Sequence, residues 1–233
     1  MSLSKTKNKF YNAKANEYTK SLTKGSLYDK VNNLIGSNLK ILDIGSANGL
    51  FDNELKKKQN KVFGIEISGV MAEKSKKYLD KVVVGDIEEM SVLPWKKNYF
   101  DVILLMDVLE HLFLPELTLR LIKPYLKKSG VIITTLPNVA NWEVRKNIVS
   151  GKFDYEKSGI MDSGHIRFFT QKTATKMFKD SGYSVLFSDC ILKLPSFLSK
   201  LDNRFKFLNI QSLCKNKYRN IFAYQFIFLL KRV

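Results

Sequence analysis

The fold is decided by residues 41–50, which read Ile-Leu-Asp-Ile-Gly-Ser-Ala-Asn-Gly-Leu. An apolar run ends directly at Gly45, a pattern that predicts a buried strand followed by a tight turn. Gly45 and Gly49 have the spacing G-x-x-x-G, whereas dinucleotide-binding turns have the spacing G-x-G-x-x-G. The stretch therefore predicts a strand–turn–helix unit whose backbone can approach a ligand, and it disfavours a nicotinamide dehydrogenase.

Apolar runs and amphipathic segments alternate on both sides of this turn. The predicted strands are residues 39–44, 61–67, 82–84, 100–106, 130–136, 183–189 and 224–230. The predicted helices are residues 10–22, 26–35, 49–58, 70–79, 115–126 and 171–181. Strands that alternate with helices build βαβ units. The sequence therefore predicts an α/β fold with a mostly parallel sheet and helices on both of its faces.

The net charge of +17 lies mainly at the two flanks of the chain. Residues 1–40 carry eight lysines and two acids, and residues 190–233 carry nine basic residues and one acid. One interpretation is attraction to phosphates, in a sugar nucleotide, a lipid phosphate or RNA. The other interpretation is a set of solvated lysines without a ligand, and the sequence leaves both open.

The composition, 45% apolar and 12% aromatic, is ample for a substantial core. Cys190 and Cys214 have no metal-ligand spacing, so we expect free thiols. The N-terminus is polar and lysine-rich and lacks the apolar core of a signal peptide. The apolar stretch at residues 221–230 has about half the length of a membrane-spanning helix. We therefore expect a soluble, cytoplasmic protein without membrane insertion; the oligomeric state is left open.

Acidic side chains follow the next two predicted strands. Glu66 stands at the end of the second strand, where a carboxylate can accept both hydroxyls of a ribose. Asp86 follows the third strand, where a carboxylate can accept an amino hydrogen of adenine. Ligands of open α/β sheets bind at the carboxyl ends of the strands. The glycine turn and both acids should therefore meet at one site.

In these motifs residues 38–190 resemble the class I S-adenosylmethionine-dependent methyltransferases. The glycine turn is similar to the family's cofactor loop, Glu66 to its ribose acid and Asp86 to its adenine acid; Ser46-Ala47 departs from the Cys-Gly or Gly-Thr of many members. The resemblance implies S-adenosylmethionine as the cofactor and a Rossmann-like sheet of seven strands, the last antiparallel. It implies cofactor contacts from Asp43, Gly45, Ser46, Ala47, Asn48, Gly49, Glu66, Ile67, Gly85, Asp86, Ile87, Met106 and Asp107.

The N-terminal helices and two long connections complete the predicted organisation. Tyr11 and Tyr18 resemble the helix that closes over the cofactor in ubiquinone-pathway O-methyltransferases, which implies a helical cap at residues 1–36 and a methyltransferase domain at residues 37–233. Simple helix packing is the alternative role for these tyrosines. Residues 137–170 are too long for an ordinary loop and predict a lid over the acceptor site. Residues 192–220 predict a basic helical insertion beside the mouth of that site.

Both histidines of the chain fall where a methyl acceptor should sit. His111 follows the fourth strand in Asp-Val-Leu-Glu-His, after Glu110, and His165 lies inside the predicted lid in Gly-His-Ile-Arg-Phe-Phe-Thr. Methyl transfer needs orientation of the acceptor, and a base where the acceptor must lose a proton. Histidine, with an unperturbed pKa near 6.5, suits that role. The residues predicted to be catalytic are therefore His111, Glu110 and His165, with a structural role as the alternative.

A metal site is a further hypothesis for the same residues. The Asp-x-x-Glu-His run resembles the Glu-x-x-Glu-His of small-RNA 2′-O-methyltransferases, where it binds a divalent ion, and a similar run of ubiquinone-pathway enzymes. Asp107, Glu110, His111 and His165 together would offer oxygen and nitrogen ligands that suit Mg²⁺, Mn²⁺ or Zn²⁺. Many methyltransferases keep a Glu-His there without a metal, so the sequence leaves the ion open.

The segments at 136–145, 151–155, 165–170 and 220–226 resemble a bacterial subfamily associated with cell-surface polysaccharide synthesis, and relatives of a methionine-biosynthesis accessory methyltransferase. Amides, a stacking ring and guanidinium groups there would suit a sugar or phosphate acceptor. The predicted acceptor-binding residues are Asn138, Asn141, Trp142, Arg145 and Arg167. Anchoring of the long loop is the alternative role for each of them.

Three functions compete at this point. The first is an O-methyltransferase that acts on a small polar acceptor, a sugar nucleotide or a phosphorylated glycan precursor. The second is an RNA 2′-O-methyltransferase with a metal site, which the basic flanks favour; no RNA-binding signature is visible, so we expect no tight binding of nucleic acid. The third is a non-catalytic, cofactor-binding partner of a biosynthetic enzyme, which a disrupted glycine turn would have favoured.

Overall fold

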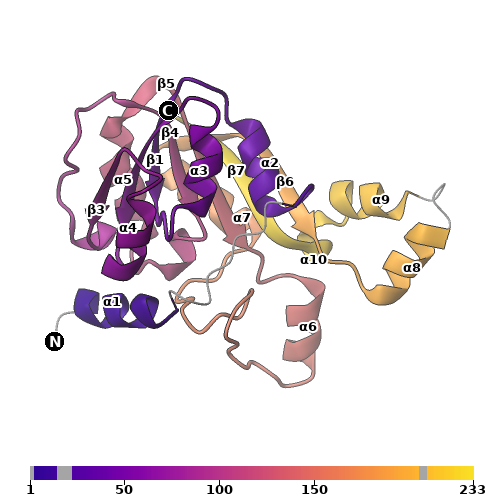
Figure 1. Cartoon of the computed structure of the whole chain (residues 1–233). Helices are drawn as coiled ribbons and strands as arrows, with labels where there is room; N and C mark the ends of the chain where they lie inside the picture. Colours follow the sequence, from indigo (N-terminus) through magenta and orange to yellow (C-terminus); the bar gives the residue numbers. More distant parts are fainter. Residues whose placement is uncertain (1–2, 15–22, 205–208) are drawn as a thin grey trace.

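The computed structural model describes residues 3–14, 23–204 and 209–233. Its centre is a seven-stranded sheet with the order β3-β2-β1-β4-β5-β7-β6 (Figure 1). The strands are β1 Lys40–Ile44, β2 Lys61–Glu66, β3 Lys81–Val84, β4 Phe100–Met106, β5 Leu126–Pro137, β6 Tyr183–Leu192 and β7 Ala223–Arg232. The first five pair in parallel, whereas β7 pairs antiparallel with β5 and β6. The predicted fold, with an antiparallel last strand, is confirmed.

Each face of the sheet is covered by its own helices. Leu42 and Ile44 pack in one apolar cluster that includes residues of α5 (Pro115–Ile122) and α7 (Gln171–Asp180). Ile41, directly before Leu42, packs in a second cluster with residues of α2 (Leu27–Leu34) and α3 (Leu50–Lys56). Successive side chains of a strand point to opposite faces, so a strand covered on both sides must be apolar throughout. This is why the central strands are mostly apolar, with Asp43 as a buried polar exception in β1.

Two helices differ from the prediction. The first helix, α1, spans Leu3–Lys14 and so begins earlier than predicted; residues 15–22 of the predicted helix lie outside the described residues. Polar residues hold α1 in place: Asn8 Nδ2 donates to the Ile67 carbonyl at 2.6 Å. Apolar periodicity cannot reveal such contacts. Helix α6 (Trp142–Val149), inside the predicted lid, was not expected, and Asn141 caps its first turn.

The basic segment at residues 192–220 contains three short helices, α8 Ser196–Arg204, α9 Ile210–Asn216 and α10 Arg219–Phe222. In Figure 1, α8 and α9 extend away from the sheet, and α10 leads back into β7. Cys190 and Cys214 are both buried free thiols. In the part of the chain that the structure describes, no helix is long and apolar enough to cross a membrane.

Candidate active site

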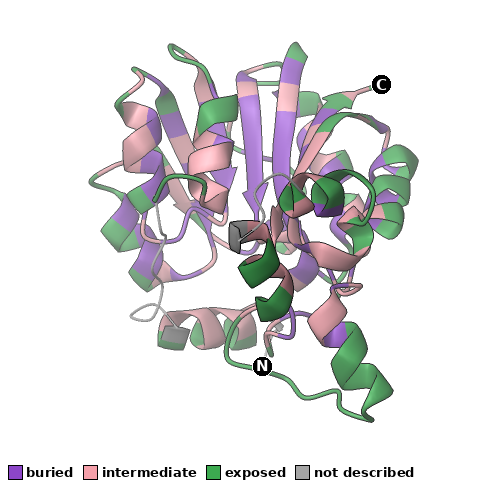
Figure 2. Cartoon of the chain, turned by 90° about the vertical axis from the view of Figure 1, so that its right-hand side faces the viewer, coloured by how far each residue is buried: buried purple, intermediate pink, exposed green. Residues whose placement is uncertain are grey.

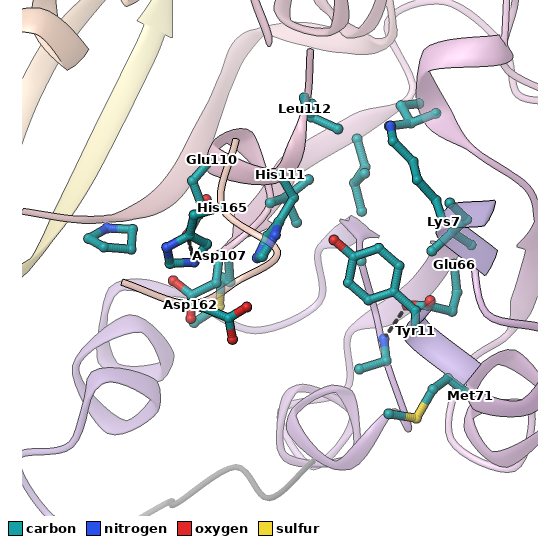
Figure 3. Close-up of a pocket in the computed structure, with 18 of the residues that line it drawn as sticks. Lys7, Tyr11, Glu66, Met71, Asp107, Glu110, His111, Leu112, Asp162 and His165 are labelled. Carbon is teal, nitrogen blue, oxygen red and sulfur yellow. Dashed lines mark hydrogen bonds and ion pairs between the residues drawn. The ribbon is translucent and has the colours of Figure 1, made fainter. Parts of the chain in front are cut away.

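A cavity of about 600 Å³ opens at the carboxyl ends of β1, β2 and β4 (Figure 3). One end, which we call the turn end, is lined by Gly45, Ala47, Glu66 and Asp86. The opposite part, which we call the histidine end, is lined by Glu110, His111, Asp162 and His165. The volume is within the range of small-molecule sites, roughly 300–1,000 Å³. The two ends therefore belong to one site of ligand size.

The turn end begins at a backbone that requires glycine. Gly45 has φ +79°, and a Cβ added there would lie 2.7 Å from a methyl group of Val108. Gly49 has φ +75°, and a Cβ there would meet the backbone of Ser75 at 3.0 Å. Any side chain would be strained and crowded at both positions. The turn is thus held open to the cavity, with Gly45 anchored by a 2.8 Å hydrogen bond from its amide to the Ile65 carbonyl.

Glu66 organises the turn as well as facing the cavity. Its Oε2 accepts a hydrogen bond from the Ala47 amide and its Oε1 from the Ser68 amide, each at 2.8 Å. Asp86 lies nearby and caps the short 3₁₀ helix η1 (Ile87–Glu89) through the Glu88 amide at 3.0 Å. Two buried carboxylates with fixed orientations therefore line this end of the cavity, each with acceptor capacity left for a ligand.

Helix α1 lies across the turn end. Lys7 Nζ approaches Asp86 Oδ2 at 3.3 Å and Glu88 Oε2 at 2.5 Å. Partial burial alone would raise the pKa of Glu88, but hydrogen bonds from Lys7 and from backbone amides outweigh it, and the pKa is lowered. Tyr11 places its ring edge-on to His111, with 5.8 Å between centroids. Burial, reinforced by the charge of Glu110, raises the pKa of the Tyr11 phenol, so its hydroxyl stays neutral.

At the histidine end the two imidazoles lie together. Their ring centroids are 4.7 Å apart, although His111 belongs to the 3₁₀ helix η2 (Leu109–His111) and His165 to the 137–170 segment. His111 Nδ1 lies 2.8 Å from the Gly164 carbonyl, and His165 Nδ1 lies 2.9 Å from the Ile160 carbonyl. A carbonyl can only accept, so each neutral ring carries its proton on Nδ1. Nε2 of each ring is then the basic nitrogen.

Glu110 lies beside His165 and is 1% exposed. Its carboxylate accepts no hydrogen bond from the residues that the structure describes, and the His165 Nε2 stands 4.0 Å from its Oε1. Burial, with the charge of Asp107 added, raises the pKa of Glu110 well above its usual range. The Glu110 carbonyl accepts the amides of Ile166 and Arg167, each at 3.0 Å. Glu110 therefore ties η2 to the 137–170 segment and brings a protonatable carboxyl to the cavity.

Asp107, the fourth residue of the proposed metal set, is hydrogen-bonded to residues of β5 and β7. It has φ +56°, unusual for a side-chain-bearing residue, and its Oδ1 accepts hydrogen bonds from Thr135 Oγ1 at 2.7 Å and from Gln225 Nε2. Ligand atoms of Glu110, His111 and His165 lie within 4.8 Å of one another. Three of the four predicted ligands thus form a compact group, and Asp107 is held toward β5 and β7.

A family model described as a methyltransferase domain matches residues 15–187 of the chain. The chain belongs to this methyltransferase family. Its methyl donor is S-adenosylmethionine, so the protein is an S-adenosylmethionine-dependent methyltransferase. No curated protein matches the sequence significantly.

Solved structures share the fold of this methyltransferase at low sequence identity. A possible histamine N-methyltransferase from Thermotoga maritima has a TM-score of 0.61 and 22% identity, over 88% of this chain and 87% of that one. A methyltransferase from Archaeoglobus fulgidus has a TM-score of 0.63 and 20% identity, over 96% of this chain and 99% of that one. A methyltransferase in complex with the Haloferax volcanii Trm112 activator has a TM-score of 0.64 and 17% identity, over 95% of this chain and 97% of that one. The polysaccharide and ubiquinone-pathway subtypes stay predictions.

Most of the predicted cofactor residues of the methyltransferase line the cavity: Tyr11, Gly45, Ala47, Glu66, Ile67, Gly85, Asp86, Ile87, Met106 and Asp107. Asp43 and Ser46 instead lie buried beneath the turn. Asn48 Oδ1 accepts the Leu50 amide at 3.3 Å, and Gly49 is the N-cap of α3. These four residues hold the conformation of the turn and do not line the cavity. Tyr18 lies outside the described residues.

The two predicted acceptor asparagines fasten the 137–170 segment to β7. Asn138 Nδ2 donates to the carbonyls of Asn220 and Ala223 at 3.1 and 2.8 Å. Asn141 Nδ2 donates to the Ala223 carbonyl at 3.0 Å, and its Oδ1 accepts the Glu143 amide at 3.0 Å. Both side chains are fully buried and are not among those lining the cavity. Their contacts are those of loop anchors, the alternative that the sequence had left open.

The other three predicted acceptor residues are also bound to backbone. Trp142 Nε1, Arg145 Nε and Arg167 Nη2 each donate to a main-chain carbonyl, at 2.7, 2.6 and 2.5 Å. None of the three lines the cavity. The guanidinium groups that suggested a phosphate-binding acceptor site thus serve the conformation of the segment.

Several cavity residues were missed by the sequence reasoning. At the turn end these are Lys7, Tyr28 and Met71, and at the histidine end Pro137, Lys157, Ser158, Gly159, Asp162, Tyr224 and Gln225. Met71 could have been found, because it stands in the first turn of α4 (Gly69–Ser75), directly after β2. The histidine-end residues come from a loop and from β7, where no spacing rule marks a side chain as cavity-facing.

Proposed function

We propose that this methyltransferase transfers a methyl group to a hydroxyl of a small polar acceptor, with the donor at the turn end and the acceptor at the histidine end. The observation that carries the proposal is the pair of histidines, whose Nδ1 atoms are fixed by carbonyls beside a cavity that also holds Glu66 and Asp86. A hydroxyl, unlike a neutral amine, must lose a proton to become a good nucleophile, and the site brings proton acceptors to the place where this happens.

The turn end fits S-adenosylmethionine. Glu66 and Asp86 are spaced along neighbouring strands, as a ribose and an adenine require, and the turn at Gly45 leaves room for a ligand against the backbone. When bound, S-adenosylmethionine supplies an electrophilic methyl group on a sulfonium sulfur. Glu66 would accept hydrogen bonds from the ribose hydroxyls and Asp86 from the adenine amino group. Tyr11 and Lys7 of α1 would cover the ligand from outside.

At the histidine end, His111 is the proposed base. The acceptor oxygen forms a bond to the methyl carbon while the carbon–sulfur bond breaks, and the hydroxyl proton moves to Nε2 of His111. The Gly164 carbonyl holds the ring in the required tautomer. His165 packs against His111 and orients the acceptor, and the protonatable carboxyl of Glu110 lies 4.0 Å from Nε2 of His165. The proton then passes from His111 to solvent.

The lining of the histidine end favours a sugar unit as the acceptor. Lys157, Ser158, Asp162, Tyr224 and Gln225 bring hydrogen-bond donors and acceptors to it. Such a mixed set suits vicinal hydroxyls. A sugar nucleotide or a phosphorylated glycan precursor remains the proposed class, with Lys157 as the side chain that would meet a phosphate.

The test is a screen of sugar nucleotides and free sugars with methyl-labelled S-adenosylmethionine, followed by magnetic resonance of the product. We expect an O-methyl resonance on one sugar. Methylation of a nitrogen would contradict the hydroxyl assignment. Donor binding without transfer to any acceptor would favour the non-catalytic alternative. A tight RNA complex at physiological salt, where counterion release weakens such binding, would favour the RNA alternative.

A cation-assisted version of the reaction is favoured by the compact group of Glu110, His111 and His165. A divalent ion held there would bind the acceptor oxygen and lower its pKa. The base mechanism and the ion mechanism differ in one observable. We expect activity to survive chelation, because His111 can accept the proton itself; loss on chelation with rescue by Mg²⁺, Mn²⁺ or Zn²⁺ would support the ion instead.

A further inference from the structure

Helices α8 and α9 lie outside the layers that cover the sheet. α8 packs against α9, and α9 reaches the body of the protein through α10 and β6. In Figure 1 the two helices project to one side, and Figure 2 turns that side toward the viewer, where the nearest helices carry mostly exposed and half-buried residues. The part of the chain formed by α8, α9 and Tyr218, which we call the projecting hairpin, therefore offers a surface that the described fold does not use.

The surface of the projecting hairpin is apolar at several positions. Phe197 and Leu201, one helical turn apart on α8, are 61% and 39% exposed. Leu213 on α9 is 49% exposed and Tyr218, just beyond it, 40%. Residues four positions apart share one face of a helix. Exposed apolar side chains on a projecting element are a feature of interaction sites.

The segment that carries these apolar side chains has an excess of positive charge. Residues 192–220 contain seven lysines and arginines and one aspartate. Lys193 and Lys215 pair with Glu143 and Asp189 of the body, at 2.6 and 2.7 Å. Lys200 and Lys217 are exposed and form no ion pair with another described residue. Apolar side chains beside a surplus of lysine are the pattern of short helices that lie at the surface of an anionic bilayer.

We propose that the projecting hairpin binds the surface of a membrane that contains anionic phospholipids. Phe197, Leu201 and Leu213 enter the boundary between headgroups and acyl chains, while Lys200 and Lys217 meet the headgroup phosphates. A second copy of the chain fits less well, because two patches of the same positive sign would face each other. An RNA backbone would form ion pairs with the lysines but would leave the leucines exposed to water. The inference does not depend on the identity of the methyl acceptor.

The test is co-sedimentation of the full chain with vesicles of phosphatidylcholine mixed with phosphatidylglycerol, compared with phosphatidylcholine alone. We expect binding to the mixed vesicles and its loss at high salt, since the Debye length falls from about 10 Å at 0.1 M to about 3 Å at 1 M. The double variant Lys200→Glu/Lys217→Glu should lower the partition coefficient at least roughly 25-fold, since each lysine contributes about fivefold and the two factors multiply. Phe197→Ser/Leu201→Ser should lower it roughly tenfold.

Matched variants elsewhere separate the hairpin from the overall charge. Lys96→Glu/Lys128→Glu changes the net charge equally at other exposed lysines, and Val92→Ser/Leu117→Ser removes side chains that are 71% and 55% exposed. We expect both to bind vesicles like the wild type, and all variants to keep the thermal unfolding midpoint and donor affinity. The proposal would be overturned if the protein did not bind mixed vesicles, or if the matched variants weakened binding equally. It would also be overturned if the protein formed a dimer without lipid and the Phe197→Ser/Leu201→Ser substitutions abolished that dimer.

Discussion

The turn end and the histidine end of the cavity are built in opposite ways. Most of the turn end comes from one stretch of chain, between Gly45 and Asp86, to which α1 and α2 add Lys7 and Tyr28. Both oxygens of Glu66 are held by backbone amides. The histidine end joins η2, the 137–170 segment and β7, and the Glu110 carboxylate accepts no hydrogen bond from the described residues. The contrast teaches that the donor site is rigid and local. The acceptor site is assembled from distant segments and holds polar groups that a ligand would complete.

The largest effect should come from the histidine end. His111→Ala removes the proposed base, and we expect kcat to fall roughly 10²–10⁴-fold. Calorimetry with S-adenosylmethionine should show nearly unchanged donor affinity, because the variant leaves the turn end intact. His165→Ala is the companion variant and should raise the acceptor KM more than it changes donor affinity. Full activity of His111→Ala on the true acceptor would remove the base role.

Substitutions at the turn end should lower the affinity for the methyl donor rather than the turnover number. Glu66→Ala deprives the Ala47 and Ser68 amides of their acceptor, together with the ribose hydroxyls, and should weaken donor binding by roughly 1–3 kcal/mol. Asp43→Ala and Asp86→Ala should weaken it as well. Glu73→Ala, at an exposed glutamate of α4, is the matched control. If calorimetry gives one affinity for all four variants, the donor assignment fails.

A smaller effect should appear where the 137–170 segment is anchored. Asn141→Ala leaves the buried Ala223 carbonyl without one of its donors and uncaps α6, which should lower the free energy of unfolding by about 1–2 kcal/mol. Urea unfolding measures this, with the exposed Asn147→Ala as the control. An unchanged unfolding curve combined with a raised acceptor KM would return Asn141 to the acceptor site.

The smallest effect concerns the pH dependence of stability. Because burial and Asp107 raise the pKa of Glu110, the folded protein retains a proton that the unfolded chain releases at mildly acidic pH. The free energy of unfolding should therefore fall as pH rises above the unfolded pKa of about 4.3. Glu110→Gln carries no such proton, so its stability relative to the wild type should increase from pH 5 to pH 8. A difference that stays constant across this range would show that Glu110 is ionised in the fold.

The sequence predicts the turn end far better than the histidine end. Gly45, Glu66 and Asp86 each follow a strand in a fixed order, so strand prediction alone places them together. His111 and His165 were predicted for the acceptor site, and their rings indeed lie together. Tyr224, Gln225 and Asp162 could not be predicted, because β7 and a long loop reach the cavity through tertiary packing. Trp142 and Arg145, predicted as acceptor contacts, each donate a hydrogen bond to a main-chain carbonyl, and a sequence does not distinguish such a loop contact from a ligand contact.

The position of β7 between β5 and β6 also sets an order for synthesis of the protein. β6 lies at the edge of the sheet and, among the described strands, pairs with β7, which the ribosome makes later. Asn138 and Asn141 likewise donate hydrogen bonds to the carbonyl of Ala223, which is also synthesised later. The parallel strands β1 to β4 pair with neither β6 nor β7, and N-terminal units fold first during translation. A nascent chain can thus complete its nucleoside pocket while β6 and the outer edge of β5 remain unpaired, so a chaperone would have to shield both strands until β7 emerges.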